Sequence, residues 1–279
     1  MLTPEQRADW QRDGYIILPD FKSALEIAQL RKRAEQIVDD FDPNESRTIF
    51  TTRDQEAASD AWFLGSDNMV RCFFEEEAFG PDGKLKQAKA LSINKIGHAM
   101  HDLDPVFAAF TRDPKLAALA GDLGLHDPKV WQAQYIFKQP GIGGEVRWHQ
   151  DATFFDSTPI SVTTFWFALE DATVDNGCLW AEPGGHRCPL RERFVREGDT
   201  IAMEKLDATP WPDNSVAVPL PAKAGTLICF HGLLPHYSAP NRSPVSRHAF
   251  TLHATDGGTV YSPKNWIQRG ADMPVRGFE

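Results

Sequence analysis

A histidine and a carboxylate that stand two positions apart, His149 and Asp151, are the first residues whose types and spacing suggest chemistry. Side chains two positions apart on an extended chain point to the same face, so an imidazole nitrogen and a carboxylate oxygen can reach one ion. A histidine from a distant strand would complete a set of two histidines and one carboxylate, which leaves one face of an octahedral Fe(II) open. The pair alone carries little weight, because it also occurs at ordinary surface and capping positions.

Two histidines that follow a hydrophobic run compete for the third position, His231 and His236. Each has an arginine eleven residues later, Arg242 and Arg247. Arg242 falls in a turn rich in proline and is expected in solvent, whereas Arg247 falls in an alternating segment that is typical of a strand. We therefore prefer His236 together with Arg247. His231 is expected to pack in the core or to support the site from behind its ligands. The remaining histidines, including His253, are expected to be surface, turn or satisfied core residues.

The alternating segment places Arg247, Ala249, Thr251 and His253 on one face. An arginine on the inner face of a barrel would be a buried, unpaired charge unless an anion meets it. A guanidinium can bind a carboxylate through two parallel hydrogen bonds, and this suits the far end of a dicarboxylate such as 2-oxoglutarate. The residues thus predict an Fe(II) site beside a site for a dicarboxylate.

The elements that must position these residues begin with helices and continue with strands. Thr3 is an expected N-cap, and Gly14 can end the first helix. A second helix is expected from about Ser23 on its helical spacing of apolar residues, and Asp104 and Asp113 each precede a proline that favours a helix start. Strands are expected at 15–18, 131–137, 162–169, 178–181, 215–218, 226–231 and 247–253. Helices followed by strands indicate a mainly β protein in which flanking helices pack against a large antiparallel structure.

We expect one domain over residues 1–279, with a helical N-terminal part at about 1–128 and a β core at about 130–260. The segment at about 42–90 is polar and shows little periodicity. A segment of this length inside a compact domain is often a mobile lid, but it can equally be an irregular excursion on the surface. No internal repeat or linker divides the chain.

The formal net charge is −10, which argues against a nucleic acid or an anionic membrane surface as partner. No run of about 18 apolar residues predicts a membrane span. The four cysteines form no C-x-x-C pair and are expected to be reduced thiols. These observations, with the absence of a signal segment at the N-terminus, predict a cytoplasmic protein with a small-molecule substrate and leave the oligomeric state open.

Several stretches together resemble the phytanoyl-CoA dioxygenase family of Fe(II)- and 2-oxoglutarate-dependent oxygenases. The similarity is strongest to the branch named phytanoyl-CoA dioxygenase domain-containing protein. The matching stretches run in order through nearly the whole chain: SINKIGH (92–98), YIFKQP (135–140), GEV (144–146), HQDA (149–152), EDAT (170–173), NGCLW (176–180), PGGH (183–186), His236, SR (246–247) and SPKNW (262–266).

The resemblance implies a double-stranded β-helix, or jelly-roll, core of the cupin-like kind. It implies that His149, Asp151 and His236 hold Fe(II) and that Arg247 pairs with the C5 carboxylate of 2-oxoglutarate. Three further residues fall where that branch contacts the cosubstrate, namely Lys95, Trp166 and Gln134, the last at a position where that branch has methionine.

The resemblance also implies the reaction, in which O₂ is consumed, a small organic substrate is hydroxylated, and succinate and CO₂ are released. Related halogenases have a small residue in place of the iron-binding carboxylate, so Asp151 favours hydroxylation. Two alternatives remain at this stage. One is a cupin-type metalloenzyme that does not use 2-oxoglutarate, although the H-x-H pair usual in cupins is absent. The other is a non-catalytic sensor that binds the metal and 2-oxoglutarate.

Overall fold

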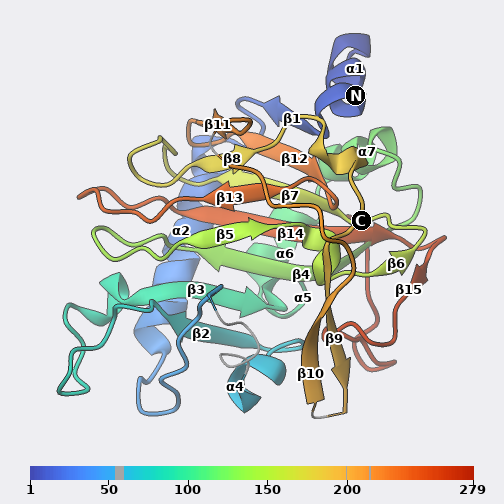
Figure 1. The fold of residues 1–279 in the computed structure, drawn as a ribbon. Helices are drawn as coiled ribbons and strands as arrows, with labels where there is room; N and C mark the ends of the chain where they lie inside the picture. The colour runs from blue at the N-terminus through green and yellow to red at the C-terminus, as the bar shows by residue number, and fades with distance from the viewer. Residues whose placement is uncertain (54–59, 199, 214) are drawn as a thin grey trace.

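Two antiparallel sheets face each other in the computed structural model, which describes residues 1–279 except 54–59, 199 and 214 (Figure 1). The larger sheet has the strand order β1 (Tyr15–Leu18), β12 (Leu227–His231), β7 (Thr163–Ala168), β14 (Ala249–Asp256), β4 (Pro128–Ile136), β3 (Ile93–His98) and β2 (Val70–Phe74). The smaller sheet has the order β11 (Val218–Leu220), β8 (Leu179–Ala181), β13 (His236–Ser238) and β5 (Val146–His149). The jelly-roll architecture predicted from the sequence is confirmed.

Two short ribbons extend this sandwich. One is the hairpin of β9 (Glu192–Glu197) and β10 (Thr200–Lys205), and the other pairs β6 (Ser157–Thr158) with β15 (Val260–Tyr261). In Figure 1 the hairpin projects below the two sheets, next to α4 (Ala61–Leu64).

Helices cover the outer face of the larger sheet (Figure 1). They are α2 (Ala24–Asp40), α5 (Met100–Leu103), α6 (Pro105–Thr111) and α7 (Pro114–Asp122), whereas α1 (Pro4–Asp13) lies beyond β1 at the edge of the sheet. The short 3₁₀ turns are η1 (Lys89–Leu91), η2 (Asp151–Thr153) and η3 (Gly185–Arg187). The expected starts are confirmed, because Thr3 and Ser23 each form a capping box and Asp104 and Asp113 each cap a helix that begins with proline.

Side chains along the central strands of the larger sheet point alternately to the hydrophobic core and to the space between the sheets. On β14, Phe250 and Leu252 pack into the hydrophobic cluster under the helices, whereas Thr251 and His253 point into the space between the sheets. On β7, Phe165 joins the same cluster. The outer face therefore carries the apolar residues that pack under the helices, whereas the inner face carries polar residues at the cavity and a second apolar cluster against the smaller sheet.

The N-terminal part is less purely helical than the sequence suggested. Besides the expected β1, it contributes β2 and β3 to the edge of the larger sheet, and β2 lies inside the segment 42–90. Phe73, Phe74 and Glu75 are fully buried, so β2 and the residue that follows it belong to the core, whereas residues 79–90 lie at the surface or are half-buried. Residues 54–59 of the expected lid lie outside the described residues.

Several strand predictions need correction. The strand expected at 215–218 lies at β11, Val218–Leu220, and β14 begins at Ala249, just after Arg247. Strands β5, β9, β10 and β13 were not predicted. β5 and β13 are only three or four residues long, and the hairpin strands are rich in charge, so neither pair carries a readable hydrophobic alternation.

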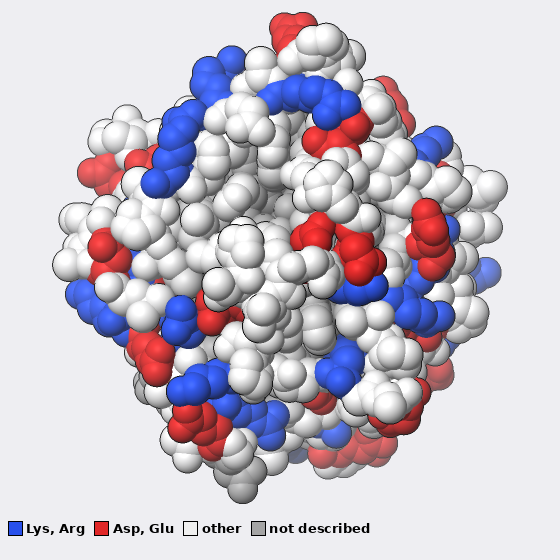
Figure 2. Space-filling model, turned by 90° about the vertical axis from the view of Figure 1, so that its right-hand side faces the viewer, with Lys and Arg blue, Asp and Glu red and all other residues white. Residues whose placement is uncertain are grey.

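The surface carries charges of both signs. On the face that Figure 2 shows, Lys and Arg side chains alternate with Asp and Glu side chains. Throughout the described part of the chain, no helix combines the length and apolar character needed to cross a membrane.

Candidate metal centre

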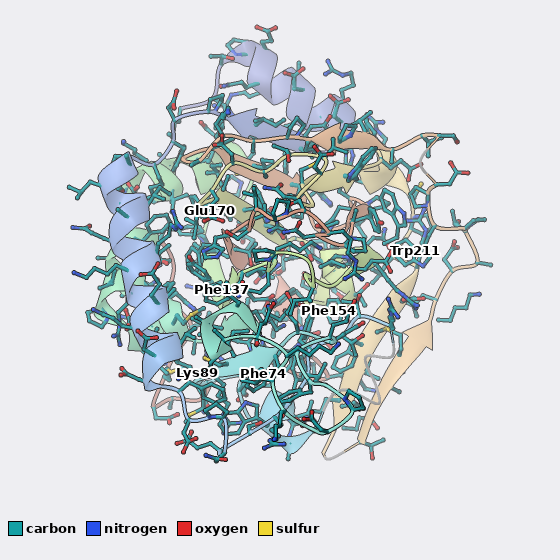
Figure 3. All side chains as sticks on the ribbon, turned by 90° about the vertical axis from the view of Figure 1, so that its left-hand side faces the viewer. Phe74, Lys89, Phe137, Phe154, Glu170 and Trp211 are labelled. Carbon is teal, nitrogen blue, oxygen red and sulfur yellow. The ribbon has the colours of Figure 1, made fainter. Side chains whose placement is uncertain are left out.

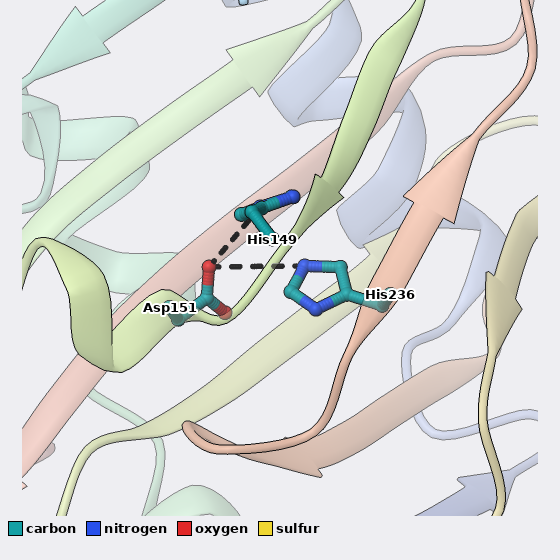
Figure 4. Close-up of side chains that lie close together, drawn as sticks. All are labelled: His149, Asp151 and His236. Atoms are coloured by element: carbon teal, nitrogen blue, oxygen red, sulfur yellow. Dashed lines mark ion pairs between the residues drawn. The ribbon is translucent and has the colours of Figure 1, made fainter. Parts of the chain in front are cut away.

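Two histidines and one aspartate converge between the sheets. His149 ends β5 and His236 begins β13, and the two residues are direct partners in the antiparallel register. Asp151 follows on η2, and its Oδ1 lies 3.5 Å from His149 Nε2 and 3.7 Å from His236 Nε2 (Figure 4). One ligand atom from each residue lies within 4.8 Å of the others, so the structure brings together the three predicted metal ligands.

The backbone orients both imidazoles toward this point. His149 Nδ1 lies 2.8 Å from the carbonyl of Arg147, and His236 Nδ1 lies 3.0 Å from the carbonyl of Leu234. A carbonyl oxygen can only accept, so each Nδ1 carries the proton and donates it. Each Nε2 therefore presents a lone pair to the space beside Asp151, as a metal-binding histidine requires.

Charge and burial set the protonation states that a metal needs. Burial lowers the pKa of His236 to about 4, and the neighbouring His149 adds to this effect. Burial alone would raise the pKa of Asp151, but the nearby His236 and His253 outweigh it and hold the pKa well below its ordinary value. A neutral imidazole and an ionised carboxylate are the forms that bind divalent metals.

The second oxygen of Asp151 has its own partners. Thr164 Oγ1 donates a short hydrogen bond to Oδ2, and His253 Nε2 lies 3.6 Å from the same oxygen. The expectation that His253 is an ordinary histidine is therefore wrong, because the pairing of β14 with β7 brings it beside the site. No spacing in the sequence pointed to Thr164, whose position depends on the same pairing.

A cavity of about 570 Å³ opens from the three ligands, and Arg247, Lys95, Gln134 and Trp166 all line it. Part of its wall is aromatic: Phe50, Phe63, Trp148, Phe154, Phe155, Trp211 and Trp266. Figure 3, seen from the side of α2, shows Phe154 and Trp211 toward the part of the molecule that carries the hairpin β9–β10.

Arg247 is buried in the cavity wall with 1% of its surface exposed. Its Nε donates to the carbonyl of Gly177 at 3.0 Å, and its Nη2 donates to Ser238 Oγ at 3.3 Å. Its Nη1 has no hydrogen-bond partner among the described residues. Burial lowers the pKa of Arg247 to about 10, so the guanidinium stays charged at neutral pH and requires an anion.

The other three predicted residues lie on the inner face of the larger sheet or beside Arg247. The Lys95 ammonium is buried over the ring of Phe50, 3.4 Å from its centroid, and burial lowers its pKa well below the ordinary value. Gln134 Nε2 donates to Gln132 Oε1 at 2.6 Å. The ring centroid of Trp166 lies 5.5 Å from the guanidinium carbon of Arg247.

The rejected candidates lie elsewhere. His231 packs against Trp10, with 6.1 Å between the ring centroids, and its Nδ1 accepts from the backbone N–H of Leu233. Arg242 is half exposed and pairs with Glu77 at 2.6 Å. The sequence argument that preferred His236 with Arg247 thus agrees with the geometry, whereas Ser238, beside Arg247, carried no signal in the sequence.

The donor set fits the group that the residues suggest. Two imidazole nitrogens and one carboxylate oxygen, with open positions, are typical of non-heme Fe(II) sites that activate O₂. Arg247 Nη1, buried and without a partner in the described residues, supplies the independent observation that an anion belongs in the same cavity.

Comparisons with known proteins show what this chain is similar to. The family profile described as phytanoyl-CoA dioxygenase (PhyH) matches residues 10–249. A protein of Arabidopsis thaliana named phytanoyl-CoA dioxygenase is 47% identical over 274 residues, which cover 98% of this chain and 95% of that protein. The phytanoyl-CoA dioxygenase domain-containing protein 1 of Bos taurus is 42% identical over 98% of this chain and 97% of that protein.

Solved structures of lower identity share the fold. The crystal structure of EctD from S. alaskensis with 2-oxoglutarate and 5-hydroxyectoine has a TM-score of 0.67 at 24% identity, covering 99% of this chain and 87% of that one. The non-heme alpha ketoglutarate dependent carbocyclase SnoK from nogalamycin biosynthesis has a TM-score of 0.65 at 18% identity, covering 99% and 96% of the two chains.

Proposed function

The chain belongs to the phytanoyl-CoA dioxygenase family and is an Fe(II)- and 2-oxoglutarate-dependent oxygenase, and from this premise we propose that His149, Asp151 and His236 hold its iron. One observation carries the proposal: the three ligand atoms converge in the same cavity as a buried guanidinium that lacks an anionic partner within the described chain. Neither a cupin-type site without 2-oxoglutarate nor a hydrolytic metal site requires that arginine.

The cosubstrate binds along the inner face of the larger sheet. Arg247 would pair with the C5 carboxylate of 2-oxoglutarate through Nη1, which has no partner among the described residues. Ser238 lies beside Arg247 and accepts a hydrogen bond from its Nη2. Lys95, Gln134 and Trp166 surround the rest of the molecule. The buried Lys95 ammonium supports this role, because a carboxylate would relieve the cost of its desolvation.

Iron with bound 2-oxoglutarate supplies the oxidation, in which O₂ is consumed and succinate and CO₂ are released. The protein's part is orientation and exclusion of water. The carbonyls of Arg147 and Leu234 fix the planes of the two imidazoles, and the aromatic walls keep the cavity apolar around the substrate. Asp151 fills the position that related halogenases leave small, which supports hydroxylation as the outcome.

The substrate is a small organic molecule that fits the part of the cavity lined by aromatic side chains. We place the protein in the cytoplasm. All four cysteines are free thiols, which supports a reducing compartment. Fractionation of cells that express the protein at native level tests this placement.

Formation of succinate tests the function directly. Purified protein with Fe(II), ascorbate and 2-oxoglutarate should release succinate, and His149→Ala or His236→Ala should abolish the release because each removes an iron ligand. His231→Ala is the matched control, since His231 lies against Trp10 away from the cavity. Undiminished release of succinate by both His149→Ala and His236→Ala would refute the assignment.

A further inference from the structure

We propose that Thr164 and His253 are positioning residues, which hold one carboxylate oxygen of Asp151 away from the iron so that the other alone binds it. This inference rests on the proposed function above, because it takes Asp151 as an iron ligand. It concerns the two side chains that the sequence did not connect with the site.

The register of the larger sheet brings the two residues together. Thr164 on β7 and His253 on β14 are direct cross-strand partners. Both side chains face the space between the sheets and line the cavity. Opposite residues on neighbouring strands have Cβ atoms about 5 Å apart, so both side chains can address one carboxylate group that lies above them.

The two oxygens of Asp151 have different surroundings. Oδ1 faces His149 Nε2 and His236 Nε2, at 3.5 and 3.7 Å. Oδ2 accepts the hydrogen bond of the Thr164 hydroxyl and faces His253 Nε2 at 3.6 Å. The carboxylate is therefore divided into a side that faces the other metal ligands and a side that faces the sheet.

Packing fixes both positioning side chains. Thr164 is 1% exposed and His253 is 6% exposed. The His253 ring stacks on Phe155 with 4.8 Å between centroids and 15° between planes. Within the described residues, the Thr164 hydroxyl donates its hydrogen bond to Asp151 Oδ2.

The coordination number of Fe(II) explains why Asp151 should bind through only one oxygen. An octahedral Fe(II) held by two histidines and one carboxylate oxygen keeps three positions open, which 2-oxoglutarate and O₂ need. A carboxylate that bound through both oxygens would occupy one of them. The hydrogen bond from Thr164 stabilises Oδ2 in a place where it does not compete for that position. Hydrogen-bonded partners of metal-binding side chains tune metal affinity in this way.

The test compares Thr164→Val, which keeps the shape and removes the hydroxyl, with Thr164→Ser, which keeps the hydroxyl. Fe(II) affinity of the full-length apo-protein is measured anaerobically without 2-oxoglutarate, and 2-oxoglutarate affinity is then measured on the Fe(II)-loaded protein. We expect Thr164→Val to weaken one or both affinities by about tenfold to a hundredfold. Thr164→Ser should restore the parental values. Thr163→Val is the matched control, because Thr163 precedes Thr164 on the same strand and is also buried.

A second pair of variants keeps the test independent of Thr164. His253→Phe retains the stacking surface for Phe155 and removes the ring nitrogens, whereas His253→Gln retains an N–H donor. His253→Phe should weaken the binding of Fe(II) or 2-oxoglutarate, and His253→Gln should preserve more of that binding. If both Thr164→Val and His253→Phe keep a native circular dichroism spectrum and parental affinities, the inference is overturned. Should His149→Ala also keep its Fe(II) affinity, the proposed function itself fails, so the two failures are distinguishable.

Discussion

Two cationic side chains, Lys95 and Arg247, are buried in one cavity and form no ion pair with the described residues of the protein. A buried charge without a partner is costly, so natural proteins tolerate it where a ligand supplies the opposite charge. The residues of this cavity are thus better suited to the complex with a dicarboxylate than to the free protein. Two predictions follow at the scale of single residues.

Replacement of Arg247 by methionine should weaken 2-oxoglutarate binding and leave Fe(II) binding nearly unchanged. The lost charge-assisted hydrogen bonds are each worth about 1.5–3 kcal/mol, which corresponds to a rise in Kd of at least roughly tenfold. Titration calorimetry on the Fe(II)-loaded protein measures it. Arg242→Met is the control, because Arg242 is half exposed and pairs with Glu77. A parental Kd in Arg247→Met would remove Arg247 from the cosubstrate site.

Replacement of Lys95 by methionine should stabilise the protein without ligand and weaken 2-oxoglutarate binding. Burial lowers the pKa of Lys95 well below its ordinary 10.5, so the unfolded chain holds this proton more tightly than the folded protein. The free energy of unfolding should therefore rise as the pH increases from neutral toward 10.5, and this rise should flatten in Lys95→Met. We expect a gain of roughly 1 kcal/mol or more at pH 7.

Urea denaturation of the apo-protein at several pH values measures both effects of Lys95→Met. Lys115→Met, on the surface helix α7, is the control for a simple loss of positive charge. A variant that is less stable than the parent at pH 7, with tight binding of 2-oxoglutarate retained, would show that Lys95 supports the fold and not the ligand.

Spacing along the chain reveals site residues that are near one another in sequence, but not residues that meet only through strand pairing. His149 and Asp151 are close in sequence, and His236 with Arg247 follow one hydrophobic run, so a single sequence predicts them. Thr164 and His253 are about ninety residues apart and meet only because β7 pairs with β14 in one register. That pairing is a property of the folded sheet.

At the scale of elements, Glu75 joins three parts of the chain behind the cavity. Its carboxylate is fully buried and accepts from Asn94 Nδ2 at 2.7 Å, from Gly144 N at 3.0 Å and from Gln139 N at 3.4 Å. These contacts tie the end of β2 to β3 and to the loop that leads into β5, where His149 lies. Glu75 therefore links β2 and β3 to the loop that precedes the strand of His149.

Removal of the Glu75 carboxylate and its hydrogen bonds should destabilise the protein. Glu75→Ala leaves three buried donors without their acceptor, and each unsatisfied group costs about 1–3 kcal/mol. We expect a loss of at least about 2 kcal/mol in the free energy of unfolding. Chemical denaturation compares this variant with Glu77→Ala, whose side chain is about half exposed on the same acidic run. Equal stability of the two variants would show that the Glu75 contacts contribute little.

The capped helices and the strands with a readable hydrophobic pattern were predictable, whereas β2, β3, β9 and β10 were not. Capping residues and proline mark helix starts chemically, which is why the helix starts at Thr3, Asp104 and Asp113 were found, whereas the helix from about Ser23 was found from its apolar periodicity. β2 carries the residues Cys72, Phe73 and Phe74 after an irregular stretch, and its burial comes from pairing with β3 rather than from its own pattern. Tertiary contacts decide such cases.

At the scale of the whole molecule, the two sheets contribute different parts of the site. The larger sheet carries helices on one face and the polar cavity wall on the other, and the smaller sheet supplies His149 and His236 from paired strands. The jelly-roll class was predictable from helices followed by strands and from the family resemblance. The recruitment of β2 and β3 into the larger sheet was not, because nothing in their sequence identifies the partner strand.

The most direct test of the account is an anaerobic spectrum. Fe(II) and 2-oxoglutarate are added to purified apo-protein, and the weak visible metal-to-ligand charge-transfer band is recorded, with His236→Ala and His231→Ala in parallel. No substrate is needed. We expect the band in the parent and in His231→Ala, and its loss in His236→Ala. A well-folded parent protein without the band, or a His236→Ala variant that keeps it at full strength, would contradict the assigned iron and 2-oxoglutarate site.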